Sequence, residues 1–244
     1  MQFQLFIIGD EILEGRRQDR HFPAVLERLG ARGHQLVQAH YLPDDREVLT
    51  AAFTLTLQQG AHVISCGGIG ATPDDHTRQA LALAANLALE LHGGAAELIL
   101  ARHGQAAYPH RIHMAEFPLG AQLIPNPVNQ IAGCSLRHHH LLPGFPEMAW
   151  PMLEWVLDTH YQPGTPLARR SLLVPDAREG DLIGEMEHLV TAYRRVRFSC
   201  LPSFGNARHP GPHLEFTLSG PQADVDAAFG FLQAALATRG YAVQ

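Results

Sequence analysis

Residues that could bind an anion and a metal ion are concentrated in one short segment of the chain. The segment follows an apolar run at residues 61–66 that is typical of a buried strand, and its members are Gly67, Gly68, Gly70, Thr72, Asp74 and Asp75. Glycines let a ligand approach the bare backbone, and the free amides of a loop that opens a helix favour phosphate. The two carboxylates would then need a metal ion between them and the phosphate, because like charges repel.

The same loop allows a simpler interpretation. A Gly-Gly-x-Gly turn after a strand is often only a tight connection to a helix, and aspartates in a first helical turn compensate the helix dipole. Thr72 is placed to cap such a helix, and Pro73 to occupy its first position. The loop is neither the dinucleotide fingerprint nor a P-loop, because the third glycine and the Gly-Lys-Ser/Thr ending are missing.

A second acidic pair, Asp10 and Glu11, follows the apolar strand predicted at Phe3–Ile8. If this strand neighbours the one before the glycine loop, the two pairs form a carboxylate cluster that suits Mg²⁺ or another hard cation. The alternative is that these acids are separate and solvated.

Two further groups of reactive residue types favour structural roles. His138-His139-His140 alternate between the faces of a strand predicted at Cys134–Leu142, so their rings cannot converge on one metal ion, and a polar sheet edge is predicted. Cys66 beside the glycine turn is expected to be a small buried side chain rather than a nucleophile.

Strands and helices alternate through the first 160 residues. The apolar spacing predicts a mostly parallel α/β sheet covered on both faces. Strands are expected at 3–8, 34–41, 61–66, 120–124 and 134–142, and helices at 22–29, 45–57, 74–89, 95–103 and 147–159.

The pattern changes after a Pro/Gly-rich linker at 162–166. Beyond it, the order strand, helix, strand, strand, helix predicts a small α+β domain. The expected domains are therefore residues 1–162 and 168–244.

Composition narrows the class of protein. The chain has 244 residues, a net charge of −6 and no basic run, which argues against a nucleic-acid partner. Neither a membrane span nor a signal peptide is predicted, and three widely spaced cysteines indicate reduced thiols in the cytoplasm.

Four segments together resemble the competence/damage-inducible protein A (CinA) family, whose first domain is of the molybdopterin-binding MoaB/Mog type. They are Gly9-Asp10-Glu11-Ile12-Leu13, Gly67-Gly68-Ile69-Gly70-Ala71-Thr72-Pro73-Asp74-Asp75, Pro125-Asn126-Pro127-Val128 and Leu142-Pro143-Gly144-Phe145-Pro146. The resemblance implies a three-layer α/β/α fold followed by a small KH-like α+β domain. The nicotinamide-nucleotide deamidase domain that many members carry is expected to be absent.

The resemblance also implies ligands and roles. The ligand would be molybdopterin or a nucleotide, and metal-dependent ADP-ribose hydrolysis with Mg²⁺, Mn²⁺ or Co²⁺ would be the activity. Gly67, Gly68, Gly70 and Thr72 would hold phosphate, Asp74 and Asp75 would bind metal or orient water, Asp10 and Glu11 would line the opposite wall, and Asn126 would enter from the proline loop. A homo-oligomer, dimer or trimer, is expected.

The sequence departs from the family pattern at four places. One is the segment after the Pro-Gly-Phe-Pro loop, where Glu147-Met148 follow one residue earlier than in the common form. Cys66 replaces a threonine, Asp19-Arg20-His21 replaces Asp-Thr-Asn, and residues 129–133 replace Gly-Thr-Ala-Pro-Gly with larger side chains. Retained carboxylates beside an altered loop leave two hypotheses: a metal-dependent nucleotide pyrophosphatase, and a binding or regulatory protein that has lost the chemistry.

Overall fold

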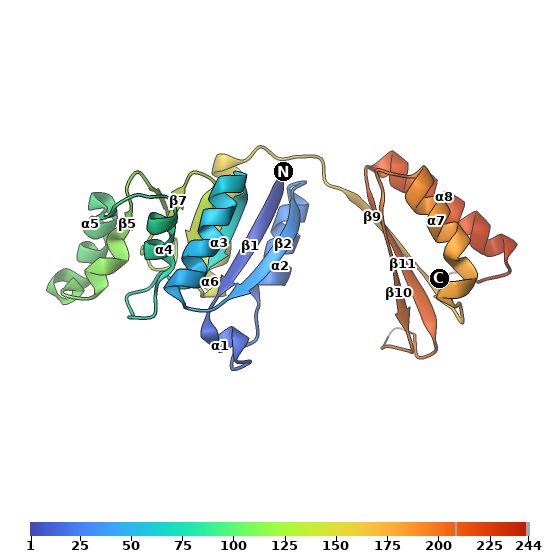
Figure 1. The fold of residues 1–244 in the computed structure, drawn as a ribbon, viewed down its shortest axis with the longest axis horizontal. Helices are drawn as coiled ribbons and strands as arrows, with labels where there is room; N and C mark the ends of the chain where they lie inside the picture. Colours follow the sequence, from blue (N-terminus) through green and yellow to red (C-terminus); the bar gives the residue numbers. More distant parts are fainter. Residues whose placement is uncertain (208, 243–244) are drawn as a thin grey trace. The chain divides into compact units, whose positions relative to one another are not determined.

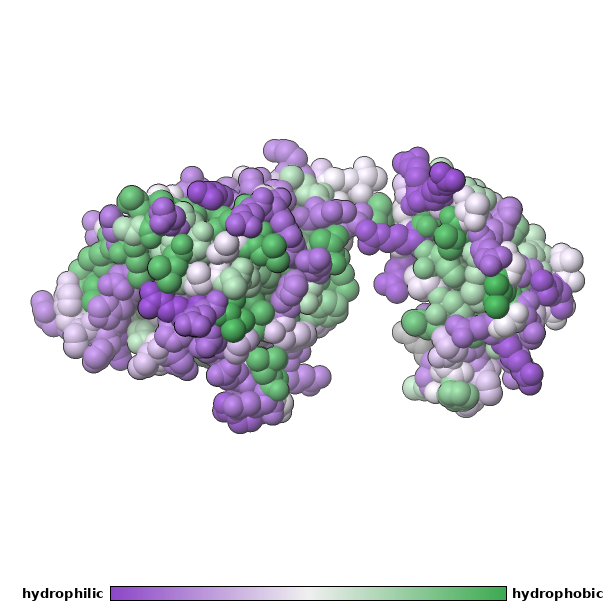
Figure 2. All heavy atoms as spheres, viewed as in Figure 1, coloured by the Kyte–Doolittle hydropathy of each residue, from purple (hydrophilic) through white to green (hydrophobic). Residues whose placement is uncertain are grey.

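The computed structural model describes residues 1–207 and 209–242 and shows two compact units, which divide between Thr165 and Pro166 (Figure 1). The face drawn in Figure 2 has hydrophilic side chains interspersed with apolar ones on each unit. Within the described residues, no helix combines the length and apolarity that crossing a membrane requires.

The first unit is built on a six-stranded sheet with the order β2-β1-β3-β8-β7-β6. The pairs β2–β1, β1–β3 and β3–β8 are parallel. Strand β7 is antiparallel to both of its neighbours, β8 and β6. The predicted mostly parallel sheet is therefore confirmed. Its strands are β1 (Gln2–Ile8), β2 (Gln35–Leu42), β3 (His62–Cys66), β6 (Gln122–Ile124), β7 (Gly133–Leu136) and β8 (His139–Leu142).

Helices cover both faces of this sheet and make three layers. The alternation of side chains along β1 sends Phe6 and Ile8 into one core and Phe3, Leu5 and Ile7 into the other. The first core includes side chains of α3 (Arg46–Gln59), α4 (Thr77–Ala84) and α5 (Gly93–His103); the second includes those of α2 (His21–Ala31) and α6 (Pro146–His160).

Smaller elements complete the unit. A short helix follows β1, and a two-stranded antiparallel ribbon with two 3₁₀ turns lies between α4 and β6 in the chain. They are α1 (Asp10–Leu13), β4 (Leu89–Leu91), β5 (Glu116–Pro118), η1 (Gly104–Ala107) and η2 (Arg111–Ala115).

The single strand predicted at 134–142 is wrong. It is a hairpin of β7 and β8, whose turn places Arg137 at φ 54°. His138 is consequently exposed in the turn, whereas His139 and His140 are each 1% exposed. They lie on β8, between β3 and β7, so the predicted polar sheet edge is also wrong.

The second unit is a small α+β arrangement in the predicted order. Its antiparallel sheet has the order β10-β11-β9 and packs Leu172, Phe216 and Leu232 in a core with its helices. The elements are β9 (Ala168–Pro175), η3 (Glu179–Leu182), α7 (Ile183–Ala192), β10 (Arg197–Ser203), β11 (His213–Gly220) and α8 (Gln222–Thr238).

Candidate ligand site in the first unit

The predicted acidic pair and glycine loop meet at the carboxyl ends of adjacent strands. β1 pairs with β3, and β3 with β8, so the segments after Ile8, Cys66 and Leu142 share one edge of the sheet. They enclose a cavity of about 410 Å³. Of the predicted site residues, Glu11, Gly67, Gly68, Gly70, Thr72, Asp74, Asp75 and Asn126 line it, and Asp10 does not. The edge of the sheet was thus predicted correctly.

Packing around the turn requires glycine at its first two positions. Gly67 has φ +114° and Gly68 has φ +66°. A Cβ atom at Gly67 would lie 2.1 Å from the carbonyl oxygen of Ile8, and one at Gly68 would lie 2.2 Å from Oγ1 of Thr77. Both contacts are far inside van der Waals distance, so the shape of the loop depends on missing side chains.

The predicted helix start at Thr72 is wrong, because α4 begins at Thr77. Asp75 instead closes the loop on itself: its carboxylate accepts hydrogen bonds from the amides of Gly70 and Thr72, both at 2.8 Å, and from the Thr72 hydroxyl. Side chains of Asp compete with helical hydrogen bonding in this way. In this structure those three donors are bound to Asp75 and not directed at a ligand.

Carbonyl oxygens of the loop are also held by the protein. The guanidinium of Arg78, a residue only 2% exposed, donates to the carbonyl oxygens of Gly70 at 2.6 Å and His113 at 2.8 Å. The hydroxyl of Thr77 donates to the Gly67 oxygen, and its amide donates to the Gly68 oxygen, both at 3.0 Å. These bonds fix the loop through its acceptors.

Three amides of the loop remain available as donors. Those of Gly68, Ile69 and Ala71 donate to no acceptor among the residues that the structure describes. All three residues line the cavity. The Gly68 and Ile69 amides are adjacent in the chain, and the Gly70 amide, which is bonded to Asp75, separates them from that of Ala71. Unpaired amides in a turn that includes positive φ are the donors that phosphate-binding loops use.

The acidic wall does not form the predicted cation cluster. Asp10 and Asp44 exchange bonds, each carboxylate accepting from the other's amide at 3.0 and 3.2 Å. Asp74 is exposed, and no group of three or more His, Cys, Asp or Glu within the described residues could hold a metal ion. Because Asp75 is also bonded to its own loop, the residues present do not fit a divalent cation.

Carboxyl groups on this wall differ in their pKa values. Burial, followed by the charges of Asp10, Glu11 and Asp74, raises the pKa of Asp44. The nearby Thr72 side chain and the amide of Asp74 itself lower the pKa of Asp74. Asp44 was not predicted as a site residue, although it follows the second strand directly, where the other site loops also begin.

The proline loop holds its own shape. Asn126 is 5% exposed; its Oδ1 accepts from the amide of Val128 at 3.0 Å and its Nδ2 donates to the Ile131 carbonyl at 3.1 Å. Asn129 donates to Sδ of Met148 at 3.3 Å. Asn126 therefore shapes the wall of the cavity, and the larger residues of this altered segment, Asn129 and Ile131, line it.

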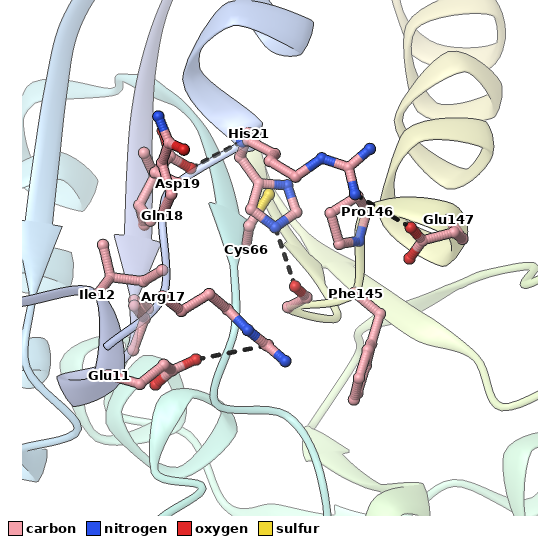
Figure 3. Close-up of a pocket in the computed structure, with 14 residues that line it drawn as sticks. Glu11, Ile12, Arg17, Gln18, Asp19, His21, Cys66, Phe145, Pro146 and Glu147 are labelled. Atoms are coloured by element: carbon pink, nitrogen blue, oxygen red, sulfur yellow. Dashed lines mark hydrogen bonds and ion pairs between the residues drawn. The ribbon is translucent and has the colours of Figure 1, made fainter. Parts of the chain in front are cut away.

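A smaller cavity of about 190 Å³ adjoins the first and shares Glu11, Arg17 and Phe145 with it (Figure 3). Arg17 extends between Glu11, at 3.8 Å, and the ring of Phe145, whose centre is 6.0 Å from Cζ. Arg17 was not predicted as a site residue, and its closeness in sequence to the acidic segment after β1 is the only feature that could have indicated it.

Two buried residues close the floor of the smaller cavity. The ring of His21 donates from Nε2 to the Gly144 carbonyl at 3.1 Å, and burial lowers its pKa, so the ring is neutral. Cys66 is 2% exposed, and burial raises the pKa of its thiol. It is thus a packed, protonated side chain and not a nucleophile.

Comparison with known proteins identifies the family of the first unit. Residues 4–162 match the model of the probable molybdopterin binding domain. The chain is 32% identical over 242 residues to a CinA-like protein of Anaeromyxobacter dehalogenans, covering 93% of this chain and 57% of that relative. It therefore spans little more than half of that relative's length.

Two further matches come from Thermoplasma acidophilum. Protein Ta0487 is 27% identical over 243 residues, which are 97% of this chain and 94% of the relative. The crystal structure of a protein CinA of unknown function aligns with a TM-score of 0.60 at 27% identity, over 65% of this chain and 98% of that one.

Proposed function

The chain belongs to the family of the probable molybdopterin binding domain, among CinA-like relatives, and we propose that its first unit binds a phosphorylated ring compound of the molybdopterin or nucleotide class. The site is the cavity of about 410 Å³ at the carboxyl ends of β1, β3 and β8. Its size is within the range of pockets that take small organic molecules.

The unpaired amides of Gly68, Ile69 and Ala71 are the observation that carries this proposal. Hydrogen bonds from amides to a charged phosphate contribute about 1.5–3 kcal/mol each where they are well formed. Since Arg78 and Thr77 already hold the loop by its carbonyl groups, little ordering is required when the anion binds.

The rest of the cavity suits a flat ring. Ile69, Ile131 and Met148 give it apolar walls, and Phe145, which is 55% exposed, presents an aromatic side chain at its rim. Arg17 beside Phe145 adds a cation that attracts phosphate.

The proposal is binding without an assigned hydrolytic step. Metal-dependent hydrolysis of ADP-ribose would need a cation held by Asp74 and Asp75, and Asp75 is engaged by Gly70 and Thr72. This engagement favours the second hypothesis, a binding or regulatory protein. Assembly as a dimer or trimer and a cytoplasmic location remain predictions.

Calorimetric titration with AMP, ADP-ribose and a pterin monophosphate tests the proposal. The variant Gly68→Ala would push a methyl group against Thr77 and disturb the free amides, so we expect at least tenfold weaker binding, about 1.4 kcal/mol. Gly60→Ala is the matched control: Gly60 has φ +62° but open space around it, at the end of α3. Equal affinities of the two variants would refute the site.

Release of AMP and ribose 5-phosphate from ADP-ribose, measured with Mg²⁺, Mn²⁺, Co²⁺ and with EDTA, separates the two hypotheses. The proposal expects binding of the nucleotide with no metal-dependent release. Release that is lost in Asp74→Asn would establish the hydrolase instead.

A further inference from the structure

Four histidines line a third cavity, at the end of the sheet where the parallel strands begin. Its volume is about 480 Å³. The histidines come from the start of β3, the β7–β8 hairpin and the end of α6; with Arg137 and Tyr161 they line the cavity as His62, His138, His140 and His160. The glycine loop follows the opposite ends of these strands, so this cavity is not part of the ligand site described above.

The charges that face this cavity are of one sign. None of its described lining residues is an aspartate or a glutamate. Asp158 lies two residues before His160 on α6, but Arg32 binds both of its oxygens, at 2.7 and 3.0 Å. An anion entering the cavity would therefore meet a guanidinium and imidazoles without a competing carboxylate on the wall.

No carboxylate is among the groups that shift the pKa values of the cavity histidines. Burial is the main cause that lowers the pKa of His62, and His138, the amino group of Met1 and His34 lower it further. Burial is also the main cause that lowers the pKa of His140 to about 3, and the other contributions come from His160, His139, His138 and His62. These neighbours belong to the residue before β1, the segment before β2, β3, the hairpin and α6.

Hydrogen bonds determine which ring atoms can meet a ligand. The Tyr161 hydroxyl lies 3.1 Å from Nδ1 of His62 and 2.6 Å from Nε2 of His140, and Nδ1 of His140 pairs with Ser135 at 2.8 Å. Both nitrogens of His140 are thus occupied. Nε2 of His62 has no protein partner among the described residues, so it is the atom left for a ligand.

Two imidazoles lie close enough to share one anion. The ring centres of His62 and His138 are 4.4 Å apart. Burial and the neighbouring His138 lower the pKa of His62, so a proton on the His62 ring is disfavoured. An oxyanion that accepts hydrogen bonds at the edges of the two rings would offset that penalty.

We propose that this cavity binds a small tetrahedral oxyanion of the sulfate or phosphate class, held by Arg137 and by the protonated rings of His62 and His138. Arg137 is exposed in the hairpin turn beside His138 and supplies the permanent charge. Because the rings must be protonated, binding takes up protons and becomes tighter as the pH falls through the range in which histidine titrates.

Sulfate is the probe for the test, since its charge is constant between about pH 5 and pH 8 while histidine titrates near pH 6.5. The Cε1–H resonance of His62 is followed by NMR through a pH titration, in millimolar sodium sulfate and in sodium chloride at equal ionic strength. An anion at hydrogen-bond distance raises a pKa by at least about one unit, so we expect the His62 midpoint to rise by about one pH unit in sulfate alone.

Three variants test whether the sulfate response of His62 arises in this cavity. Arg137→Asn removes the charge with a residue that tolerates the positive φ of this position, and should lose most of the sulfate response. Arg46→Asn removes an equal charge on α3, and Gly68→Ala disturbs only the glycine loop; both should keep it. Coincident His62 curves in sulfate and chloride, or equal responses of Arg137→Asn and Arg46→Asn, would overturn the proposal.

A second titration with glycerol 3-phosphate identifies the source of the anion. A response to both probes means that the cavity also accepts the phosphoryl group of a larger molecule, and a response to sulfate alone means that it takes the free ion. Absence of both responses refutes the site, while the nucleotide titrations of the glycine loop stand independently of this result.

Discussion

Replacing Asp75 by asparagine tests whether this side chain builds the loop or waits for a metal ion. The carboxylate accepts bonds from the Gly70 amide, the Thr72 amide and the Thr72 hydroxyl. Asparagine keeps one acceptor oxygen and substitutes an NH₂ group for the other, so it cannot accept from both the Gly70 amide and the Thr72 amide, and one of them faces an NH₂ group instead.

The magnitude follows from these bonds. Asp75 is half-buried, and leaving one amide donor beside it without an acceptor costs about 1–3 kcal/mol, so Asp75→Asn should lower the free energy of unfolding by about 2 kcal/mol. For a chain of this size that corresponds to a fall in Tm of about 4–8 °C. The loop amides would also lose their arrangement, and AMP affinity should fall about tenfold.

Differential scanning calorimetry and calorimetric AMP titration measure the two effects. Asp74→Asn is the matched control, because Asp74 is exposed and its removal should leave the Tm within about 2 °C of the unchanged protein. EDTA should alter neither protein. An Asp75→Asn variant with unchanged Tm, or an equal loss in Asp74→Asn, would refute the structural role of Asp75.

Three other predictions concern the same unit. Arg78→Lys should weaken AMP binding about tenfold in calorimetric titration, because a single ammonium cannot bind both the Gly70 and His113 carbonyl oxygens; unchanged affinity would contradict this. Arg17→Ala should weaken AMP binding in the same assay with no change in Tm, and a stability loss without an affinity loss would assign it a structural role. The pKa of His139 is lowered to about 4 and that of His140 to about 3, mainly by burial, so both rings are neutral when folded and take up protons on unfolding. Their contribution to the free energy of unfolding is therefore fully present above about pH 6.5. It falls toward about pH 4 by roughly 1.4 kcal/mol per pH unit for each ring. Urea midpoints that do not change over this range would be inconsistent with neutral buried histidines.

The sequence predicted the sheet because its central strands have a strong local signal. β1 and β3 are apolar runs ended by glycine, and their adjacency at one sheet edge follows from parallel topology. The hairpin was missed because its turn residues, Arg137 and His138, lack the glycine, asparagine or proline that marks a turn. Arg137 adopts positive φ there because pairing of β7 with β8 imposes it.

The sequence brought the predicted loops to one edge of the sheet, but it did not predict the bonds within them. Thr72 and Pro73 resemble the start of a helix, and only the tertiary structure shows that Asp75 bonds back to the loop instead. Which amides stay unpaired also depends on Arg78 and Thr77, which bond the loop carbonyls from α4. Local sequence patterns carry no information on such bonds.

Amide NMR of the glycine loop during titration with AMP shows directly whether the unpaired amides bind phosphate. We expect large shifts of the Gly68, Ile69 and Ala71 amide protons, because the phosphate would accept hydrogen bonds from them. The Gly70 and Thr72 amides stay bonded to Asp75 and should shift little. Saturable AMP binding that leaves the first three amides unmoved would contradict the proposed site.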